Sequence, residues 1–409
     1  MCDHGEISKS EKSKPEGGDL QIIHAENGTI RNVVQKITHF YHRSQLEELN
    51  DYLAKSVAAY EARMYQLVAH RQVMLKQTYK FLYAFEIEDA QIFFGREKAS
   101  EELLSTVLKD RLTVFHARSG AGKTSLINAG LSPKLIRDGR LPVYARAYDD
   151  PVLAIKRTIA SPHLGPWPEL LSKLTLHEFL GLAYTHLNRQ TKELIIVLDQ
   201  FEEFFIFWPR REHRQSFIDA LEICYQDKAI PLRFIIALRK DYYSDLADFQ
   251  KHLPNIFHNE YRLNIMSRND VKNAIIGPLR RIKRKISYEQ SLVDKMIDDL
   301  EKIGMELPYL QIICSQLYES IPSDEACITE VMYKQLGHAV GILTNYLYRA
   351  LETLPSEKKV IAQDILKELV SSEATRKVLD FDTLAHNIDS DDLTYVLKAF
   401  GNLTSSHLS

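Results

Sequence analysis

The segment that most constrains the fold of this chain is a short glycine-containing stretch at residues 117–124, Ala-Arg-Ser-Gly-Ala-Gly-Lys-Thr. Small residues let successive backbone N–H groups turn toward an anion, a lysine reaches the outer phosphates of a nucleotide, and a hydroxyl can hold Mg²⁺. An apolar run, Leu112 to His116, precedes the stretch, and a helix-like run, Ser125 to Ile136, follows it. The N-terminus of that helix would point at the anion. This order of strand, loop and helix therefore predicts a nucleotide-binding α/β domain.

The loop residues expected to contact nucleotide share small side chains, hydroxyl groups or a positive charge: Ser119, Gly120, Ala121, Gly122, Lys123, Thr124 and Ser125. Lys123 is also expected to stabilise charge during phosphoryl transfer. Ala117 stands where the strict pattern has glycine, and alanine is the common alternative there. A glycine-rich turn without a ligand is the other interpretation, and the flanking strand and helix argue against it.

Composition fits a globular, multidomain chain. Its 409 residues are 45% hydrophobic and 26% charged, which is enough for two or three domains. A net charge of −3 gives no global reason to expect nucleic acid or an anionic membrane as partner. The four cysteines lack CxxC spacing, which argues against a zinc site or disulfide framework and favours a cytoplasmic location. No apolar run approaches the ~18 residues that span a bilayer.

The residues before the loop divide into three parts. Residues 1–19 are polar and predict a disordered tail, and the Asn27-Gly28 pair between two apolar runs predicts a small hairpin. From Ser44 to Leu82 apolar residues recur at intervals of seven, which predicts an amphipathic helix or helix pair: Leu46, Leu53, Tyr60, Leu67 and Met74. Two interpretations stay open, an effector or oligomerisation arm and a helix packed on the chain's own nucleotide-binding core.

After the loop, short apolar runs alternate with helical patterns. Strands are expected at Leu141 to Ala147, Leu194 to Leu198 and Leu232 to Leu238, and helices at Pro151 to Ala160, Leu176 to Arg189 and Arg211 to Tyr225. This alternation predicts a parallel sheet with helices on both faces, the α/β class of phosphate-loop NTPases. Ligands in such sheets lie at the carboxyl ends of the strands.

Charged residues follow two of these strands. Asp199 ends the run 194–198 and is expected to hold Mg²⁺ together with Thr124. Glu202 or Glu203 could polarise the attacking water, and the sequence does not choose between them. Arg239 ends the next strand, where a cation can contact the γ-phosphate. The alternative for Arg239 is a surface arginine paired with the nearby Asp241.

Three further stretches contain candidate functional residues. An aromatic-rich lead, 78–86, runs into Phe94, Gly95 and Arg96, which could surround the base of a nucleotide. Residues 269–300 read as helices around a basic cluster at 280–285, interpreted as a solvated face or, alternatively, as a surface for nucleic acid or an acidic partner. Pro308 suits the first turn of a following helix.

In this order the motifs resemble the prokaryotic novel-STAND branch of signal-transduction NTPases, relatives of the NACHT and NB-ARC ATPases. The resemblance rests on 79–97, 119–131 and the run Asp-Gln-Phe-Glu-Glu-Phe-Phe at 199–205, and it covers about residues 78–400. It implies an NTPase core (78–265), a helical lid (266–336) and a winged-helix domain (337–409) that enclose ATP or ADP with Mg²⁺. It also implies base contacts from Phe94, Gly95 and Arg96, a first sensor at Arg239 and a lid proline at Pro308.

Two departures from the family pattern bear on the base pocket and the loop. Ala117 replaces glycine, and Lys98-Ala99 stand where the NB-ARC pattern has a second glutamate, with Glu101 the nearest substitute. Family members usually also have an effector before the core and a repeat sensor after it. The sequence ends within or just after the expected winged helix, which indicates a fragment or a short member that works with a partner.

The resemblance implies a cytoplasmic ATPase that switches from a closed ADP-bound monomer to an open ATP-bound homo-oligomer, in bacterial defence or stress signalling. Its protein trigger cannot be named from the sequence. One alternative is a DNA-associated motor or loader ATPase that uses the basic cluster at 280–285. Another is a non-hydrolysing scaffold in which bound nucleotide is structural. We expect no membrane association.

Overall fold

The computed structural model describes residues 43–69, 78–146, 150–160, 167–352, 354–368, 384–385 and 388–403. Five parallel strands form its main sheet in the order β2-β3-β4-β1-β5. Their bounds are Leu112–Ala117 (β1), Arg140–Arg146 (β2), Glu193–Asp199 (β3), Leu232–Arg239 (β4) and Glu260–Arg262 (β5). The predicted parallel sheet is therefore confirmed, and the carboxyl ends of its central strands meet at one edge.

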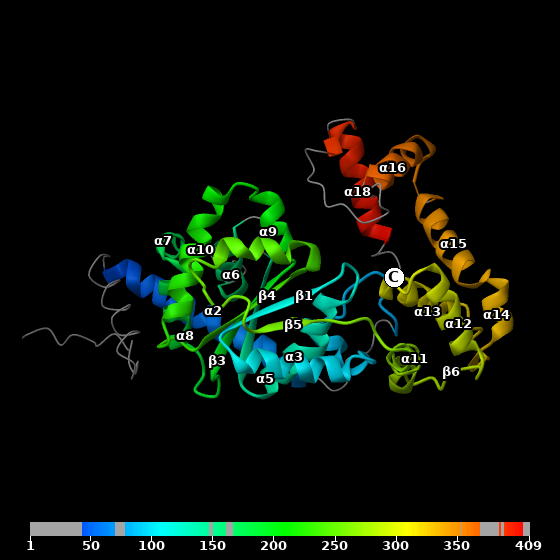
Figure 1. The fold of residues 1–409 in the computed structure, drawn as a ribbon, viewed down its shortest axis with the longest axis horizontal. Helices are drawn as coiled ribbons and strands as arrows, with labels where there is room; N and C mark the ends of the chain where they lie inside the picture. The colour runs from blue at the N-terminus through cyan, green and yellow to red at the C-terminus, as the bar shows by residue number, and fades with distance from the viewer. Residues whose placement is uncertain are drawn as a thin grey trace, which may run out of the picture.

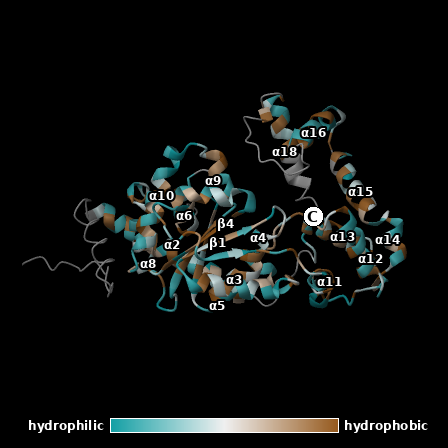
Figure 2. Cartoon of the chain, viewed as in Figure 1, coloured by the Kyte–Doolittle hydropathy of each residue, from teal (hydrophilic) through white to brown (hydrophobic). Residues whose placement is uncertain are grey.

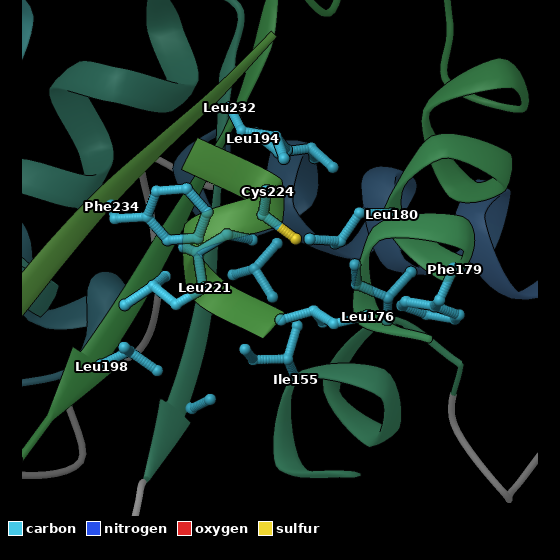
Figure 3. Close-up of a cluster of buried hydrophobic side chains, with 14 of the residues drawn as sticks. Ile155, Leu176, Phe179, Leu180, Leu194, Leu198, Leu221, Cys224, Leu232 and Phe234 are labelled. Carbon is cyan, nitrogen blue, oxygen red and sulfur yellow. The ribbon is translucent and has the colours of Figure 1, made fainter. Parts of the chain in front are cut away.

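Helices cover both faces of this sheet, as the alternating pattern predicted (Figure 1). One face carries α6 (Pro151–Ile159), α7 (Glu169–Lys173), α8 (Leu176–Thr185), α9 (Glu202–Phe207) and α10 (Arg211–Gln226). Figure 3 shows Ile155, Phe179 and Leu221 from these helices in one cluster with Leu198 and Phe234 of the strands. The other face carries α3 (Glu97–Lys109) and the helix after the phosphate loop. The sheet is buried from both sides, so its strands read as continuous apolar runs.

The helix after the phosphate loop runs from Lys123 to Arg137 in three parts. These are α4 (Lys123–Ser125), a π-helical turn η2 (Leu126–Leu131) and α5 (Ser132–Arg137). All six residues of the turn are buried. The predicted helix at 125–136 is confirmed, with a wider turn in its middle of a kind frequent at functional sites.

The helix α2 (Arg43–Ala69) lies along the outer edge of the sheet, beside strand β2. The Tyr60 hydroxyl donates to the carbonyl oxygen of Pro142 at 2.6 Å, on the edge of β2 that pairs with no other strand among the described residues. Leu53 and Val57 are fully buried in the core cluster, and the Glu61 carboxylate accepts the backbone N–H of Asn188 at 3.1 Å. These contacts favour the second interpretation of this helix, packing on its own core, because they use its apolar seam and cover an otherwise open edge.

A second, helical part follows the sheet and lies to its side in Figure 1. It contains α11 (Arg268–Ile276), α12 (Leu292–Ile303), α13 (Leu307–Glu319), α14 (Glu330–Gln335) and α15 (His338–Glu352), with a two-strand parallel pair of β6 (Ser287–Tyr288) and β7 (Cys327–Ile328). Figure 2 shows hydrophilic and hydrophobic residues alternating along helices in both parts, as expected where each helix buries one face.

One hydrophobic cluster joins α11, α12, α13 and α15. The expected boundary at residue 337 falls between α14 and α15, whose residues Tyr333, Ala339 and Ile342 share this cluster. Beyond it, α16 (Ser356–Glu368) and α18 (Ser390–Leu403) share a small cluster that includes Leu351, Ile365 and Val396. The winged helix stays a prediction, since the described part of 337–403 contains helices only and residues 369–383 lie outside it.

Several expected elements differ from those observed. The helix expected to reach Arg189 ends at Thr185, because Asn188 accepts the backbone N–H groups of Gln190 and Thr191 and forms a turn. Within 269–300, residues 282–291 are not helical and include strand β6. Strand β5 was not predicted. The tail, the hairpin and Met74 lie outside the described residues.

The pattern extended the first helix through residue 82, but residues 78–86 form turns and irregular backbone. The chain there is fixed by the helical part instead. The Tyr79 hydroxyl donates to the carbonyl oxygen of Ile275 at 2.6 Å, and the Lys80 N–H donates to Gln311 Oε1 at 2.9 Å. No helix within the described residues is long and apolar enough to cross a membrane.

Candidate nucleotide site

The phosphate loop connects strand β1 to helix α4. Gly120 and Gly122 have φ of +73° and +87°, in the left-handed region that glycine adopts without steric cost. Ala117 is the buried last residue of β1 and is not among the residues with positive φ. The chain at this position needs no glycine, so the departure from the strict pattern leaves the loop intact.

A cavity of about 300 Å³ opens above this loop. Its walls come from the aromatic segment 81–85, residues 92–94 and 96, the loop 119–125, the segment after strand β3, the end of β4, the start of α13, and two residues at α11, Met266 and Ala274. The volume lies at the lower end of the range of about 300–1,000 Å³ for small-ligand pockets. Of the site residues expected from the sequence, all but Gly95 and Asp199 line this cavity.

Asp199 lies behind the cavity wall and is fully buried. Its Oδ2 accepts a hydrogen bond from Thr124 Oγ1 at 2.6 Å and another from the Tyr144 hydroxyl. Burial raises the pKa of Tyr144, so this hydroxyl keeps its proton and donates it. Asp199 Oδ1 has no hydrogen-bond partner among the described residues.

These contacts fit a Mg²⁺ ion. A buried carboxylate oxygen without a partner is costly unless a cation or donor completes it. Mg²⁺ prefers oxygen ligands and keeps several waters, so a threonine hydroxyl and one carboxylate suffice beside the phosphates. The structure thus brings Thr124 and Asp199 together, and their role in holding Mg²⁺ stays a prediction.

The two glutamates after Asp199 face different partners. Glu202 is buried, and its Oε2 accepts the backbone N–H of Arg239 at 3.0 Å, which joins the ends of β3 and β4. Glu203 is half-buried and faces the side-chain amide of Gln200. In the amide orientation that satisfies both Glu203 and Arg146, the Gln200 nitrogen donates to Glu203 Oε1 at 2.9 Å. Gln200 has φ of +53°, a conformation that non-glycine residues adopt at a cost.

Arg239 combines the two alternatives drawn from the sequence. Its side chain lines the cavity and is 13% exposed. It also pairs with the Asp241 carboxylate, and its guanidinium lies 5.7 Å from the ring centroid of Tyr242. A nucleotide phosphate would compete with Asp241 for this cation.

The amine of Lys123 also lines the cavity. Burial lowers the pKa of Lys123, and the nearby carboxylates of Glu202 and Asp199 oppose that shift. The Lys123 side chain is half-buried and forms no ion pair within the described residues, so an anionic ligand would match its charge.

The three residues expected at the base make structural contacts. The Arg96 guanidinium donates to the carbonyl oxygens of Asn264 and Ala121 at 2.9 and 3.1 Å, and this side chain is buried. Arg96 thus connects the phosphate loop to the backbone at Asn264. Gly95 packs against the backbone of Asp270, and the Phe94 ring lines the cavity with the Arg281 guanidinium 5.9 Å from its centroid.

Helix α13 brings the helical part, where the lid is expected, to the phosphate loop. Leu307 and Pro308 line the cavity, and Leu307 Cδ1 would lie 3.3 Å from a methyl group on Gly122. The carboxylate of Glu306 comes closest: a methyl group on Gly120 would lie 2.8 Å from its Oε2. Sequence reasoning found Pro308 and missed Glu306.

Sequence reasoning also missed Tyr144 and the backbone role of the aromatic segment. The Phe85 N–H donates to Ser125 Oγ at 3.1 Å, so this segment is attached to the phosphate loop as well as to the helical part. Neither Tyr144 nor Phe85 belongs to a motif with fixed spacing. Only the register of the sheet could have placed Tyr144 near Asp199.

The basic cluster at 280–285 lies on the helical part, away from the phosphate loop. Arg284 donates to the carbonyl oxygens of Pro322 and Glu325, and Arg281 contacts Phe94. The remaining cations, Arg280, Lys283 and Lys285, border a surface hollow of about 730 Å³. Nucleic-acid binding by this cluster stays a prediction.

Comparison with known proteins identifies one family. The model of the family described as Novel STAND NTPase 1 matches residues 79–407, about four-fifths of the chain. No curated protein matches the chain.

Three solved structures are similar to this chain at low identity. The ORC1 protein of Aeropyrum pernix in complex with DNA is 13% identical, with 81% of this chain and 89% of that chain covered and a TM-score of 0.44. The ORC2 protein of the same organism in ADPNP–ADP complexes is 12% identical, with 76% and 94% covered and a TM-score of 0.43. A Walker-type ATPase of Pyrococcus abyssi is 15% identical, with 79% and 92% covered and a TM-score of 0.42. Similarity at this level supports no conclusion about what this chain binds.

Proposed function

The chain belongs to the novel STAND NTPase 1 family, and from that premise we propose that it is an ATP-binding and ATP-hydrolysing molecular switch. In its ADP-bound state the lid closes on the core and the chain is a monomer. ATP opens this arrangement and lets copies of the chain assemble. The proposed setting is cytoplasmic bacterial defence or stress signalling, with a protein trigger.

The observation that carries this proposal is that residues of the core and residues of the lid both line the cavity. Lys123, Thr124 and the strand-end acids come from the core, whereas Leu307 and Pro308 come from the lid. A nucleotide in this cavity would contact both parts at once. A ligand shifts a conformational equilibrium only through contacts that differ between its two states, and a shared wall supplies such contacts.

The aromatic segment adds a second connection. Its backbone donates to Gln311 on the lid through Lys80 and to Ser125 on the phosphate loop through Phe85. Phe81 also packs against Tyr346 of α15, with ring centroids 5.9 Å apart. We propose that the base lies against this segment, beside Phe94, so that base binding also bears on the position of the lid.

For hydrolysis we assign distinct tasks to the polar residues. Lys123 binds the outer phosphates, and Thr124 and Asp199 hold Mg²⁺, which would neutralise charge on the phosphate oxygens. Glu203 orients and deprotonates the attacking water, since it lines the cavity and is half-buried, whereas Glu202 is buried and joins the two strand ends through the Arg239 N–H. Arg239 exchanges Asp241 for the γ-phosphate.

The difference in nucleotide binding free energy that the switch requires can be estimated. Moving a two-state equilibrium from 1:99 to 99:1 needs about 5.5 kcal/mol of differential binding. Arg239 at the γ-phosphate side and Glu306 against the loop are the candidates to supply it, because each contact changes when phosphate arrives.

Separate substitutions of Lys123 and Glu203 test the proposal. We expect Lys123→Ala to abolish binding of both ATP and ADP, measured by calorimetry. Glu203→Gln should bind ATP like the wild type and hydrolyse it at least about 100-fold more slowly, the size of a general-base effect. Glu212→Gln, an exposed glutamate on α10, is the matched control and should change neither.

The other outcomes separate the alternatives. A wild type that binds ATP without hydrolysing it, and whose assembly is unchanged in Glu203→Gln, is a scaffold and contradicts the switch. A Lys123→Ala variant that binds nucleotide as well as the wild type contradicts the site itself.

A further inference from the structure

The carboxylate of Asp199 is oriented by two hydroxyl groups, of which family motifs supply only one. Thr124 Oγ1 donates to Oδ2 at 2.6 Å from the start of α4. The Tyr144 hydroxyl donates to the same oxygen from strand β2. With Oδ2 bonded twice, Oδ1 has no partner within the described residues, and both oxygens belong to a side chain that is fully buried.

The sheet places Tyr144 there by its register. Tyr144 pairs with Val197, and Asp199 lies two residues further along β3 on the same face. The neighbours of Tyr144 in sequence, Val143 and Ala145, pack into the core cluster of the opposite face. Side chains alternate along a strand, so Tyr144 and Asp199 point to the side of the phosphate-loop helix.

Helix α6 fixes the backbone that carries the phenol. Thr158 Oγ1 donates to the Tyr144 carbonyl oxygen at 2.9 Å. The ring is half-buried and packs against the cluster beneath the phosphate-loop helix. Tyr144 is therefore held from its backbone and its ring, which leaves its hydroxyl a narrow range of positions.

We propose that Tyr144 is the positioning residue for the metal-holding aspartate. Its hydroxyl fixes the rotation of the Asp199 carboxylate so that Oδ1 faces the cation, while Thr124 donates its proton to Oδ2 and keeps a lone pair for the metal. This inference rests on the proposed nucleotide site and adds a residue to it. Donors behind a metal-binding side chain set its orientation, and their loss weakens metal affinity or activity by about 10–100-fold.

The test replaces one hydroxyl and measures the metal directly. Tyr144→Phe keeps the ring and removes the donor. We would titrate Mn²⁺ and Mg²⁺ into the full chain bound to a non-hydrolysable ATP analogue and follow Mn²⁺ by electron paramagnetic resonance. We expect metal affinity to fall at least about tenfold. Nucleotide affinity in EDTA should stay within twofold of the wild type.

Activity gives a second signature. In Tyr144→Phe the Mg²⁺ concentration for half-maximal hydrolysis should rise by the same factor as the metal dissociation constant, and saturating Mg²⁺ should restore kcat. The matched control is Tyr60→Phe, which removes a hydroxyl that donates to Pro142 on the same strand, far from Asp199 in register. It should leave metal affinity unchanged.

Other results overturn the assignment. Unchanged metal affinity in a folded Tyr144→Phe variant contradicts it, and so does an equal loss of nucleotide affinity in EDTA, which would indicate a structural role. A second measurement uses the Asp199→Asn background, where Tyr144→Phe should weaken metal binding no further; an additive loss contradicts the proposal. A wild type that binds no adenine nucleotide with or without metal contradicts the proposed function itself.

Discussion

Arg96 offers the sharpest contrast between a role implied by resemblance and the contacts observed. The resemblance places it at the base and ribose, whereas its guanidinium donates to the carbonyl oxygens of Asn264 and Ala121 at 2.9 and 3.1 Å. The first carbonyl precedes the lid, and the second lies within the phosphate loop. Replacing Arg96 by alanine therefore removes a brace between the loop and the chain that leads to the lid.

The cost follows from these two bonds. Hydrogen bonds from a charged donor contribute about 1.5–3 kcal/mol each, so Arg96→Ala should lower the free energy of unfolding by about 3 kcal/mol or more. Arg96 is 8% exposed, which leaves little solvent to replace the lost donors. For the core at 78–265, a unit of the size at which 1 kcal/mol corresponds to about 2–4 °C, the melting temperature should fall by about 6–12 °C.

Thermal unfolding and nucleotide calorimetry measure the two consequences. ATP and GTP affinities should fall by the same factor, since a loosened loop affects phosphates common to both. Arg189→Ala, an exposed arginine in a turn, is the control and should change stability by no more than about 0.5 kcal/mol. Unchanged stability with a selective loss of adenine nucleotides would refute this reasoning and restore a base-contacting role.

Three further predictions concern other charged groups. Burial lowers the pKa of Lys123 in the free protein, and a bound phosphate would raise it again. ATP affinity measured in binding titrations should therefore be highest below the lowered pKa and should fall as the pH rises through it. The variant Lys123→Arg should not show this fall. Arg214→Ala breaks a buried ion pair with Asp248 and should cost about 3–5 kcal/mol in chemical unfolding, whereas Arg211→Ala, whose 81% exposed side chain pairs with the same carboxylate, should cost under about 1 kcal/mol. Glu306→Gln removes a negative charge beside the phosphate loop and should tighten ATP binding by about tenfold by calorimetry, and ADP binding by less, since ADP has one phosphate fewer.

The core of the fold was predictable because local chemistry determines it. The strand, loop and helix around Lys123 need particular residue types at adjacent positions, so the sequence displays them directly. The same holds for Asp199, which follows a buried apolar strand. Strand β5 gave no such signal, since Glu260–Arg262 is three residues long and mostly exposed.

What the sequence could not supply depends on distant partners. A seven-residue repeat is the same whether a helix pairs with another copy or covers a sheet edge. For α2 the contacts with the core, among them the Tyr60–Pro142 and Glu61–Asn188 bonds, favour the second. Tyr144 and Glu306 meet the site from strand β2 and from the lid, at sequence distances that no motif encodes. Residues 79–82 fit a helical pattern, yet they bind the lid because Tyr79 and Phe81 are buried in its cluster.

The central claim is that one nucleotide site couples the core to the lid and changes the assembly of the chain. Native mass measurement of the purified chain tests it most directly, first with its bound nucleotide identified and then after exchange into ATP and Mg²⁺. The account predicts a monomer that carries ADP and an oligomer that carries ATP, with Lys123→Ala remaining a monomer without nucleotide. The same mass in ADP and in ATP, in a chain shown to bind both, would contradict it.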